Sequence, residues 1–216
     1  MTFNTFGMLG QQLDGEPERT LIYFKEPEDV QGTFFVSINP EDEDARLWLY
    51  LPALGQAKEL VSEQQEQSFA GSTFSYREAG GESVSDEYSA QIVREDSIQI
   101  DNQEMACYLL NLTAKPDADV DFPTERMWVD KDSWLVLKIE SYNELGNLER
   151  TMEVLTLGEF DGLVVADVTV AVDVLEGNST TITFLDRRRT EEGIPPEVFD
   201  PENLSNFDPA EWGFAD

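Results

Sequence analysis

Apolar side chains alternate with polar ones at every second position through most of this chain. In the clearest case Val164, Val168 and Val172 fall on one face while Asp167 and Asp173 fall on the other. A period of two residues is typical of a half-buried β-strand. The pattern predicts strands near 2–10, 19–25, 32–38, 46–51, 57–62, 90–100, 104–114, 124–130, 134–142, 148–158, 163–175 and 180–188.

Turn-forming residues separate these runs, as at Asp-Gly 14–15, Asp-Gly 161–162 and Gly-Asn 177–178. Many strands joined by short turns predict an antiparallel meander that closes partly or wholly into a barrel or a sandwich. Helical patterning is scarce. It allows a short helix or an ordered loop within 63–80 and a short helix at 195–199, where proline suits a first helical turn.

No linker long enough to divide the chain is visible, so we expect a single β domain over residues 1–204. The remaining stretch, 205–216, is acidic, and we expect it to be a frayed tail unless Phe207, Trp212 and Phe214 dock onto the domain.

Several predicted strands are apolar on both faces, which a meander with one wet face should not be. The opposed sets are Leu21 and Tyr23 against Ile22 and Phe24, Leu47, Leu49 and Leu51 against Trp48 and Tyr50, and Met105, Cys107 and Leu109 against Tyr108, Leu110 and Leu112. Another sheet, a helix or an apolar ligand must cover the second face. Because helices are few, the sheet is expected to be under-covered and to leave an apolar concavity.

The charge of the chain excludes several classes of function. Its 14 Lys and Arg against 45 Asp and Glu give a net charge of −31, which repels nucleic-acid backbones. It has no histidine, so Ser-His-Asp and Cys-His catalysis and the commonest zinc ligand are absent. The single cysteine, Cys107, cannot form an internal disulfide, and its mid-strand position predicts an inert buried thiol. Acidity spread along the chain fits either a salt-adapted protein or an ordinary acidic one.

The ends of the sequence carry no membrane signal. No run approaches the ~18 apolar residues of a membrane-spanning helix. Residues 1–6 have neither a basic nor an apolar export region and enter a predicted strand directly. We therefore expect that an export signal is missing from the chain as given.

Four strings occur in a recognisable order: PEDVQGTFF at 27–35, WLYLPAL at 48–54, SFAGSTFSY at 68–76 and MWVDKD at 127–132. Together they resemble the outer-membrane lipoprotein-sorting proteins, which are relatives of the periplasmic carrier LolA. The resemblance extends over about 20–204. The third string departs from the family pattern SFMGSDFSYED, and this puts polar contacts at a cavity mouth in question.

The resemblance implies a mostly β fold, a half-open antiparallel β-barrel with one or two short helices. It also implies a non-enzymatic carrier that shelters acyl chains of lipids or lipoproteins and moves them across the cell envelope toward the outer membrane. The implied location is periplasmic or otherwise extracytoplasmic. The implied partners are the acyl chains, an inner-membrane RND-type transporter and an outer-membrane acceptor, and no cofactor is implied.

Aromatic side chains are the candidates for lining such a cavity, because each buries a large apolar area. The predicted lining residues are Phe24, Phe35, Trp48, Tyr50, Phe69, Phe74, Tyr76 and Trp128. The alternative for each is an ordinary core aromatic. Periodicity alone does not say which face of a strand is concave.

Other readings of the sequence stay open or fail. The acids at 117–121 open like a calcium loop, but Phe122 and Trp128 stand where glycine and glutamate are required. The arginines at 187–189 either offset nearby acids or dock on an acidic surface. A hydrolase with a carboxylate pair remains a rival, since nothing selects one pair among 45 acids. A scaffold or accessory subunit of an RND-type exporter without lipid cargo is the nearer rival.

Overall fold

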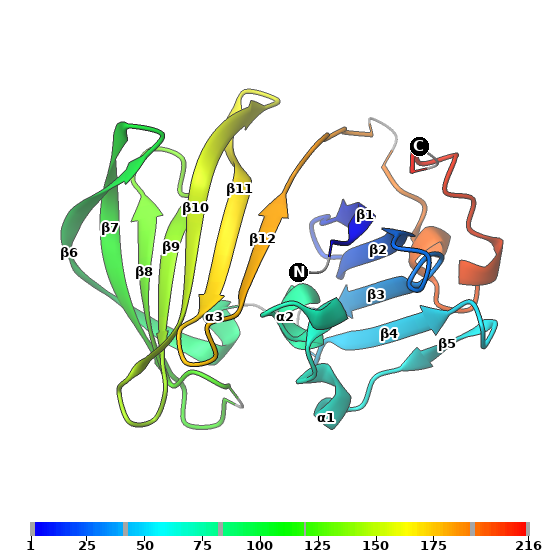
Figure 1. The fold of residues 1–216 in the computed structure, drawn as a ribbon, viewed down its shortest axis with the longest axis horizontal. Helices are drawn as coiled ribbons and strands as arrows, with labels where there is room; N and C mark the ends of the chain where they lie inside the picture. The colour runs from blue at the N-terminus through cyan, green and yellow to red at the C-terminus, as the bar shows by residue number, and fades with distance from the viewer. Residues whose placement is uncertain (1–2, 41–42, 82–83, 119, 191–192, 215–216) are drawn as a thin grey trace. The chain divides into compact units, whose positions relative to one another are not determined.

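The computed structural model describes residues 3–40, 43–81, 84–118, 120–190 and 193–214. The chain divides into two compact units (Figure 1). Unit 1 consists of Met1–Glu82 and Arg189–Asp216, and unit 2 consists of Ser83–Arg188. Because the chain leaves unit 1 and returns to it after unit 2, the C-terminal residues belong with the first strands. The division into compact units does not test whether the chain is one domain over 1–204, so that expectation stays a prediction.

Unit 1 is built on a five-stranded antiparallel meander in the order β1-β2-β3-β4-β5 (Figure 1). Its strands are β1 (Thr5–Gln11), β2 (Glu18–Glu26), β3 (Phe34–Asn39), β4 (Arg46–Leu51) and β5 (Gln56–Glu59). Sequential neighbours pair because short turns allow a chain to fold back only onto the strand before it. The sheet is open, with β1 and β5 at its edges.

Short elements flank this sheet. After β5 come α1 (Ser62–Gln65), η1 (Phe69–Gly71) and α2 (Tyr76–Ala79), and the C-terminal stretch adds η2 (Pro196–Phe199) and η3 (Leu204–Asn206). At the start of α2 the Glu78 backbone N–H donates to Ser75 Oγ at 3.1 Å, and the Ser75 N–H donates to Glu78 Oε2 at 2.8 Å. Such a capping box satisfies two donors that a helix start leaves open.

Unit 2 contains a seven-stranded antiparallel sheet in the order β12-β11-β10-β9-β8-β7-β6 (Figure 1). The strands are β6 (Tyr88–Ile100), β7 (Gln103–Ala114), β8 (Thr124–Asp130), β9 (Val136–Tyr142), β10 (Leu148–Phe160), β11 (Leu163–Asp173) and β12 (Ser179–Thr183). A single helical turn, α3 (Val84–Glu87), precedes β6. This sheet is also open, with β12 and β6 at its edges.

The predicted strands are all present in the described part of the chain, and the mostly β, antiparallel fold class with short helices is confirmed. Several strand boundaries differ from the predicted ones by one to three residues, and the end of β12 differs most. β12 ends at Thr183, five residues before the predicted end at 188, and β5 ends at Glu59. The helical turn α3 was not predicted, because its acidic sequence carries no apolar periodicity.

Candidate functional site

One face of the five-stranded sheet, which we call the C-terminal face, is apolar across three neighbouring strands. Leu21 lies opposite Val36, and Val36 lies opposite Trp48. Residues directly opposite in register share a face of the sheet. The two-residue alternation therefore also brings Tyr23, Phe34 and Tyr50 onto this face, since Phe34 pairs with both tyrosines.

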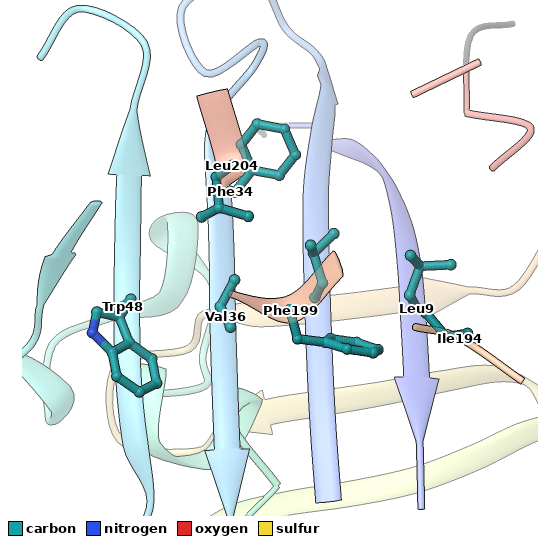
Figure 2. Packing of buried hydrophobic residues seen from close by; sticks show 8 residues of the cluster. Leu9, Phe34, Val36, Trp48, Ile194, Phe199 and Leu204 are labelled. Atoms are coloured by element: carbon teal, nitrogen blue, oxygen red, sulfur yellow. The ribbon is translucent and has the colours of Figure 1, made fainter. Parts of the chain in front are cut away.

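Residues from the far end of the sequence cover the C-terminal face. Ile194, Phe199 and Leu204 pack against the sheet residues in one cluster (Figure 2). Phe199 is 0 % exposed and Leu204 is 2 % exposed. At the start of this segment, the Gln11 side-chain amide of β1 donates a hydrogen bond to the Ile194 carbonyl at 2.8 Å. The C-terminal stretch is therefore part of the core of unit 1.

Beyond Leu204 the chain continues across the same face as a short aromatic segment. We call residues 207–214 the aromatic hook. Phe207, Trp212 and Phe214 all pack against the cluster of the C-terminal face, and all three are only half-buried. The Phe207 ring meets Phe34 edge-on with centroids 5.2 Å apart, and the Phe214 ring lies parallel to Tyr23 at 6.4 Å. The tail is therefore docked and not frayed in the described residues.

Gly7 on β1 provides the seat for the last ring of the hook. A Cβ atom at this position would fall 2.4 Å from the Phe214 ring, closer than real side chains approach one another. Only glycine therefore leaves room for the ring. Gly10, on the same strand, has nothing within 4 Å of the equivalent position.

A cavity of about 400 Å³ opens between the strands β1 and β2 and the hook. It is lined by the rings of Tyr23 and Phe214 together with the charged side chains of Lys25 and Glu26. The volume lies in the range of small-molecule sites. The mixed lining suits an amphiphile better than a purely polar ligand.

The opposite side of the same sheet, the helix-side face, is covered by the segment after β5. Phe24 and Phe35 point from the sheet toward Phe69 of η1, with ring centroids 5.6 and 5.3 Å from it. Tyr76 adds an edge-on contact with Phe69 at 5.4 Å. Burial raises the pKa of the Tyr76 hydroxyl. The string at 68–76 thus has a packing role, since it places Phe69 and Tyr76 over the sheet.

Unit 2 has its own apolar cluster around Trp128. Cys107, Leu109 and Leu137 are buried beside this ring, which is itself 8 % exposed. The Trp128 indole N–H donates to Asp96 Oδ2 at 3.1 Å. This hydrogen bond is the main reason why the pKa of the Asp96 carboxyl is lowered. Burial raises the pKa of the Cys107 thiol, as expected for an unreactive cysteine.

A belt of charged residues lies beside this cluster. Lys138 Nζ lies 3.1 Å from Glu140 and 2.9 Å from Glu153, and 5.2 Å from the centre of the Trp128 ring. Burial opposes the charge of Lys138, but its bonds to Glu153 and Glu140 prevail and raise its pKa. The Glu140 pKa is lowered, since hydrogen bonds from Tyr142 and Lys138 outweigh burial. The Glu140 carboxylate is therefore held in its charged form by its partners.

The structure does not bring the predicted lining residues together in one place. Phe24, Phe35, Phe69 and Tyr76 share the cluster of the helix-side face. Trp48 and Tyr50 lie on the C-terminal face, and Trp128 lies in unit 2. Phe74 is half-buried between η1 and α2. A role in ligand binding for these residues stays a prediction.

The expectation of an under-covered sheet is wrong for unit 1. Both faces of its sheet are covered by the chain itself, one by the segment at 60–79 and the other by the segment at 194–214. The sequence reading missed Phe199 and Leu204 as cover. The sequence does carry one signal for this cover. Apolar residues are interspersed among acids at 198–214, in a pattern that fits no strand but is compatible with short turns packed on a sheet.

The described residues bear on several other candidates from the sequence. No group of three or more potential metal ligands occurs among the described residues. In the acidic loop at 117–121, residue 119 lies outside the described part, as do residues 41–42 beside the acidic turn before β4. Arg187 pairs with Asp167 and Arg188 pairs with Asp186, so these arginines offset nearby acids. Among the described helices none is long and apolar enough to cross a membrane.

Comparison with known structures shows which proteins share this fold. The chain is similar to a domain described as an outer-membrane lipoprotein-sorting protein domain from Vibrio parahaemolyticus, with a TM-score of 0.81 and 23 % identity over 94 % of this chain and 83 % of that chain. A DUF1329 family protein from Desulfovibrio piger matches with a TM-score of 0.81 and 24 % identity over 91 % and 82 %. A LolA superfamily protein from Nitrosomonas europaea matches with a TM-score of 0.66 and 20 % identity over 91 % and 81 %.

These likenesses show the fold, which is that of the outer-membrane lipoprotein-sorting and LolA-superfamily proteins. The resemblance predicted from the sequence strings is thereby confirmed. A search of the curated proteins gives no match. A family model described as "Uncharacterized protein" matches residues 16–206, and the chain belongs to that family.

Proposed function

We propose that this protein is a non-enzymatic carrier that binds acyl chains of lipids or lipoproteins and moves them across the cell envelope toward the outer membrane. Its fold, shared with lipoprotein-sorting proteins, supports this proposal. The proposed location is periplasmic or otherwise extracytoplasmic. The proposed partners are an inner-membrane RND-type transporter as donor and an outer-membrane acceptor.

The observation that carries the proposal is how the apolar faces of unit 1 are closed. Both faces of the five-stranded sheet are apolar, yet their covers are single helical turns and irregular segments. A second sheet or a long helix would add a regular hydrogen-bonded layer, which is costly to move. A half-buried irregular segment such as 207–214 can separate from the sheet locally, because segments with few buried contacts are the least stable parts of a protein.

The energetics suit a carrier without side-chain chemistry. Each acyl methylene taken from water contributes about 0.8 kcal/mol, so about a dozen contribute on the order of 10 kcal/mol before ordering and desolvation are subtracted. This gain holds a chain in water but does not prevent its release to a membrane of equal apolarity. Of the aromatic residues predicted as lining, Trp48 and Tyr50 lie on the C-terminal face and are proposed contacts.

Native mass spectrometry of the purified protein tests the proposal, together with extraction and identification of bound lipid. We expect a population carrying fatty acid or phospholipid, and the stripped protein to bind the fluorescent fatty acid cis-parinaric acid. A protein that is empty and also leaves the probe in water would contradict a carrier role.

A scaffold or accessory subunit of an RND-type exporter, with no lipid cargo, is the second candidate. The observation in its favour is that the protein's own side chains fill both faces of the sheet in unit 1, with Phe35 and Phe199 each 0 % exposed. The same experiment separates the two, because a scaffold binds partner protein but neither lipid nor probe.

A further inference from the structure

We propose that the aromatic hook is a displaceable cover, and that an acyl chain binds the C-terminal face in its place. This inference rests on the proposed carrier function and names a site for it. The site is the part of the sheet around Gly7, Tyr23 and Phe34 that the hook covers, together with the adjoining cavity.

The first argument is that the seat of the hook is shaped for an inserted apolar group. Gly7 leaves a depression on β1 that the Phe214 ring fills, and Tyr23 forms a parallel aromatic wall beside it. A depression between the Gly7 backbone and aromatic rings accepts a methylene chain as readily as a ring, because apolar contact has little directional preference.

The second argument is that the hook is held less firmly than the segment before it. Phe199 and Leu204 are buried almost completely, whereas Phe207, Trp212 and Phe214 remain half-exposed. The backbone hydrogen bonds of 207–214 close turns with 204–210, such as the bond of 2.8 Å from the Phe214 N–H to the Pro209 carbonyl. Among the described residues no hydrogen bond joins the hook to the sheet. It can therefore leave as a unit while Phe199 and Leu204 stay in place.

The third argument concerns entry and charge. The cavity of about 400 Å³ already separates part of the hook from β1 and β2, so a chain end can enter beside Tyr23 before the rings move. Asp208 and Glu211 of the hook are exposed, and Asp208 lines the cavity together with Lys25 and Glu26, so charged groups stand beside the point of entry. The exchange then replaces aromatic contacts by methylene contacts.

Two glycines on one strand supply the test. Gly7→Ala places a methyl group where the Phe214 ring lies and should push the hook away, whereas Gly10→Ala on the same strand meets nothing. Both are single methyl additions to β1, but Gly7 is buried under the hook whereas Gly10 is exposed on the other face, so Gly10→Ala controls for the effect of alanine in the strand itself. Phe214→Ala removes the ring by an independent route and replaces Gly7→Ala in the test if the latter does not fold, as judged by urea denaturation.

The measurement is titration of the full chain with cis-parinaric acid. We expect Gly7→Ala and Phe214→Ala to bind the probe at least about fivefold more tightly than the unchanged protein, because the competing cover is weakened. Gly10→Ala should match the unchanged protein within about twofold. In the unchanged protein, the probe should also shift Trp212 emission to longer wavelength, and Trp212→Phe should remove that part of the signal.

The outcomes separate this inference from the proposed function. Equal probe binding by the unchanged protein, Gly7→Ala and Phe214→Ala, or weaker binding by the latter two, would overturn the displaceable cover and leave the carrier function standing. Absence of binding in every protein would overturn both.

Discussion

Replacement of Phe199 by alanine tests whether the C-terminal segment belongs to the core of unit 1. The Phe199 side chain is 0 % exposed and lies against the sheet from η2 (Figure 2). An aromatic side chain buries about 200 Å², which at about 25 cal/mol per Å² corresponds to ~5 kcal/mol. Compactness of the unfolded chain lowers this to about 3–4 kcal/mol, and the cavity left behind adds to it. We expect Phe199→Ala to lower the free energy of unfolding by about 3–5 kcal/mol.

Urea denaturation followed by tryptophan fluorescence measures this change, with Trp48 and Trp212 reporting on unit 1. Leu13→Ala is the matched control, because Leu13 is 53 % exposed in the same unit, and we expect it to change stability by less than about 0.5 kcal/mol. A loss below about 1 kcal/mol for Phe199→Ala would refute the reasoning, since it would mean that the segment does not contribute to the core.

Three further outcomes follow from the structure. The pKa of Glu140 is lowered in the folded protein, so its stabilising effect is present above the pKa of the unfolded chain and is lost as the pH falls through the folded pKa. The melting temperature should therefore fall in acid, and it should fall less in Glu140→Gln. In Gly158→Ala a Cβ would overlap the Asp167 carboxylate, so we expect a loss of about 1–3 kcal/mol by urea denaturation, and an unchanged stability would contradict a packed contact there. With a net charge of −31, the melting temperature should rise from low to molar NaCl, and an unchanged value would contradict a role for self-repulsion.

The strands were predictable because one local signal dominates each of them. The alternation around Leu21 and Trp48 determines which side chains share a face, and short turns determine which strands are neighbours. The fold class therefore follows from local pattern together with connection rules. The end of β12 was not predictable, because apolar residues, Phe184 and Leu185, follow Thr183 although the register with β11 ends there.

The covers of the sheet were not predictable in the same way. Strands that are apolar on both faces correctly indicated that something must cover the second face, but the covering residues lie at the other end of the sequence. Phe199 and Leu204 reach the sheet through single turns, which leave no periodic signal. The aromatic strings identified apolar residues but did not show which face of the sheet each residue lies on. Phe35 and Trp48 were predicted to line one cavity, but they lie on opposite sides of the sheet.

The most direct test of the carrier proposal is transfer of a fluorescent acyl lipid from donor to acceptor vesicles, measured with and without the protein. We expect the rate of transfer to rise in proportion to protein concentration, as it does when a soluble carrier takes lipid through water. A rate that stays at the spontaneous value at every protein concentration would contradict the carrier function.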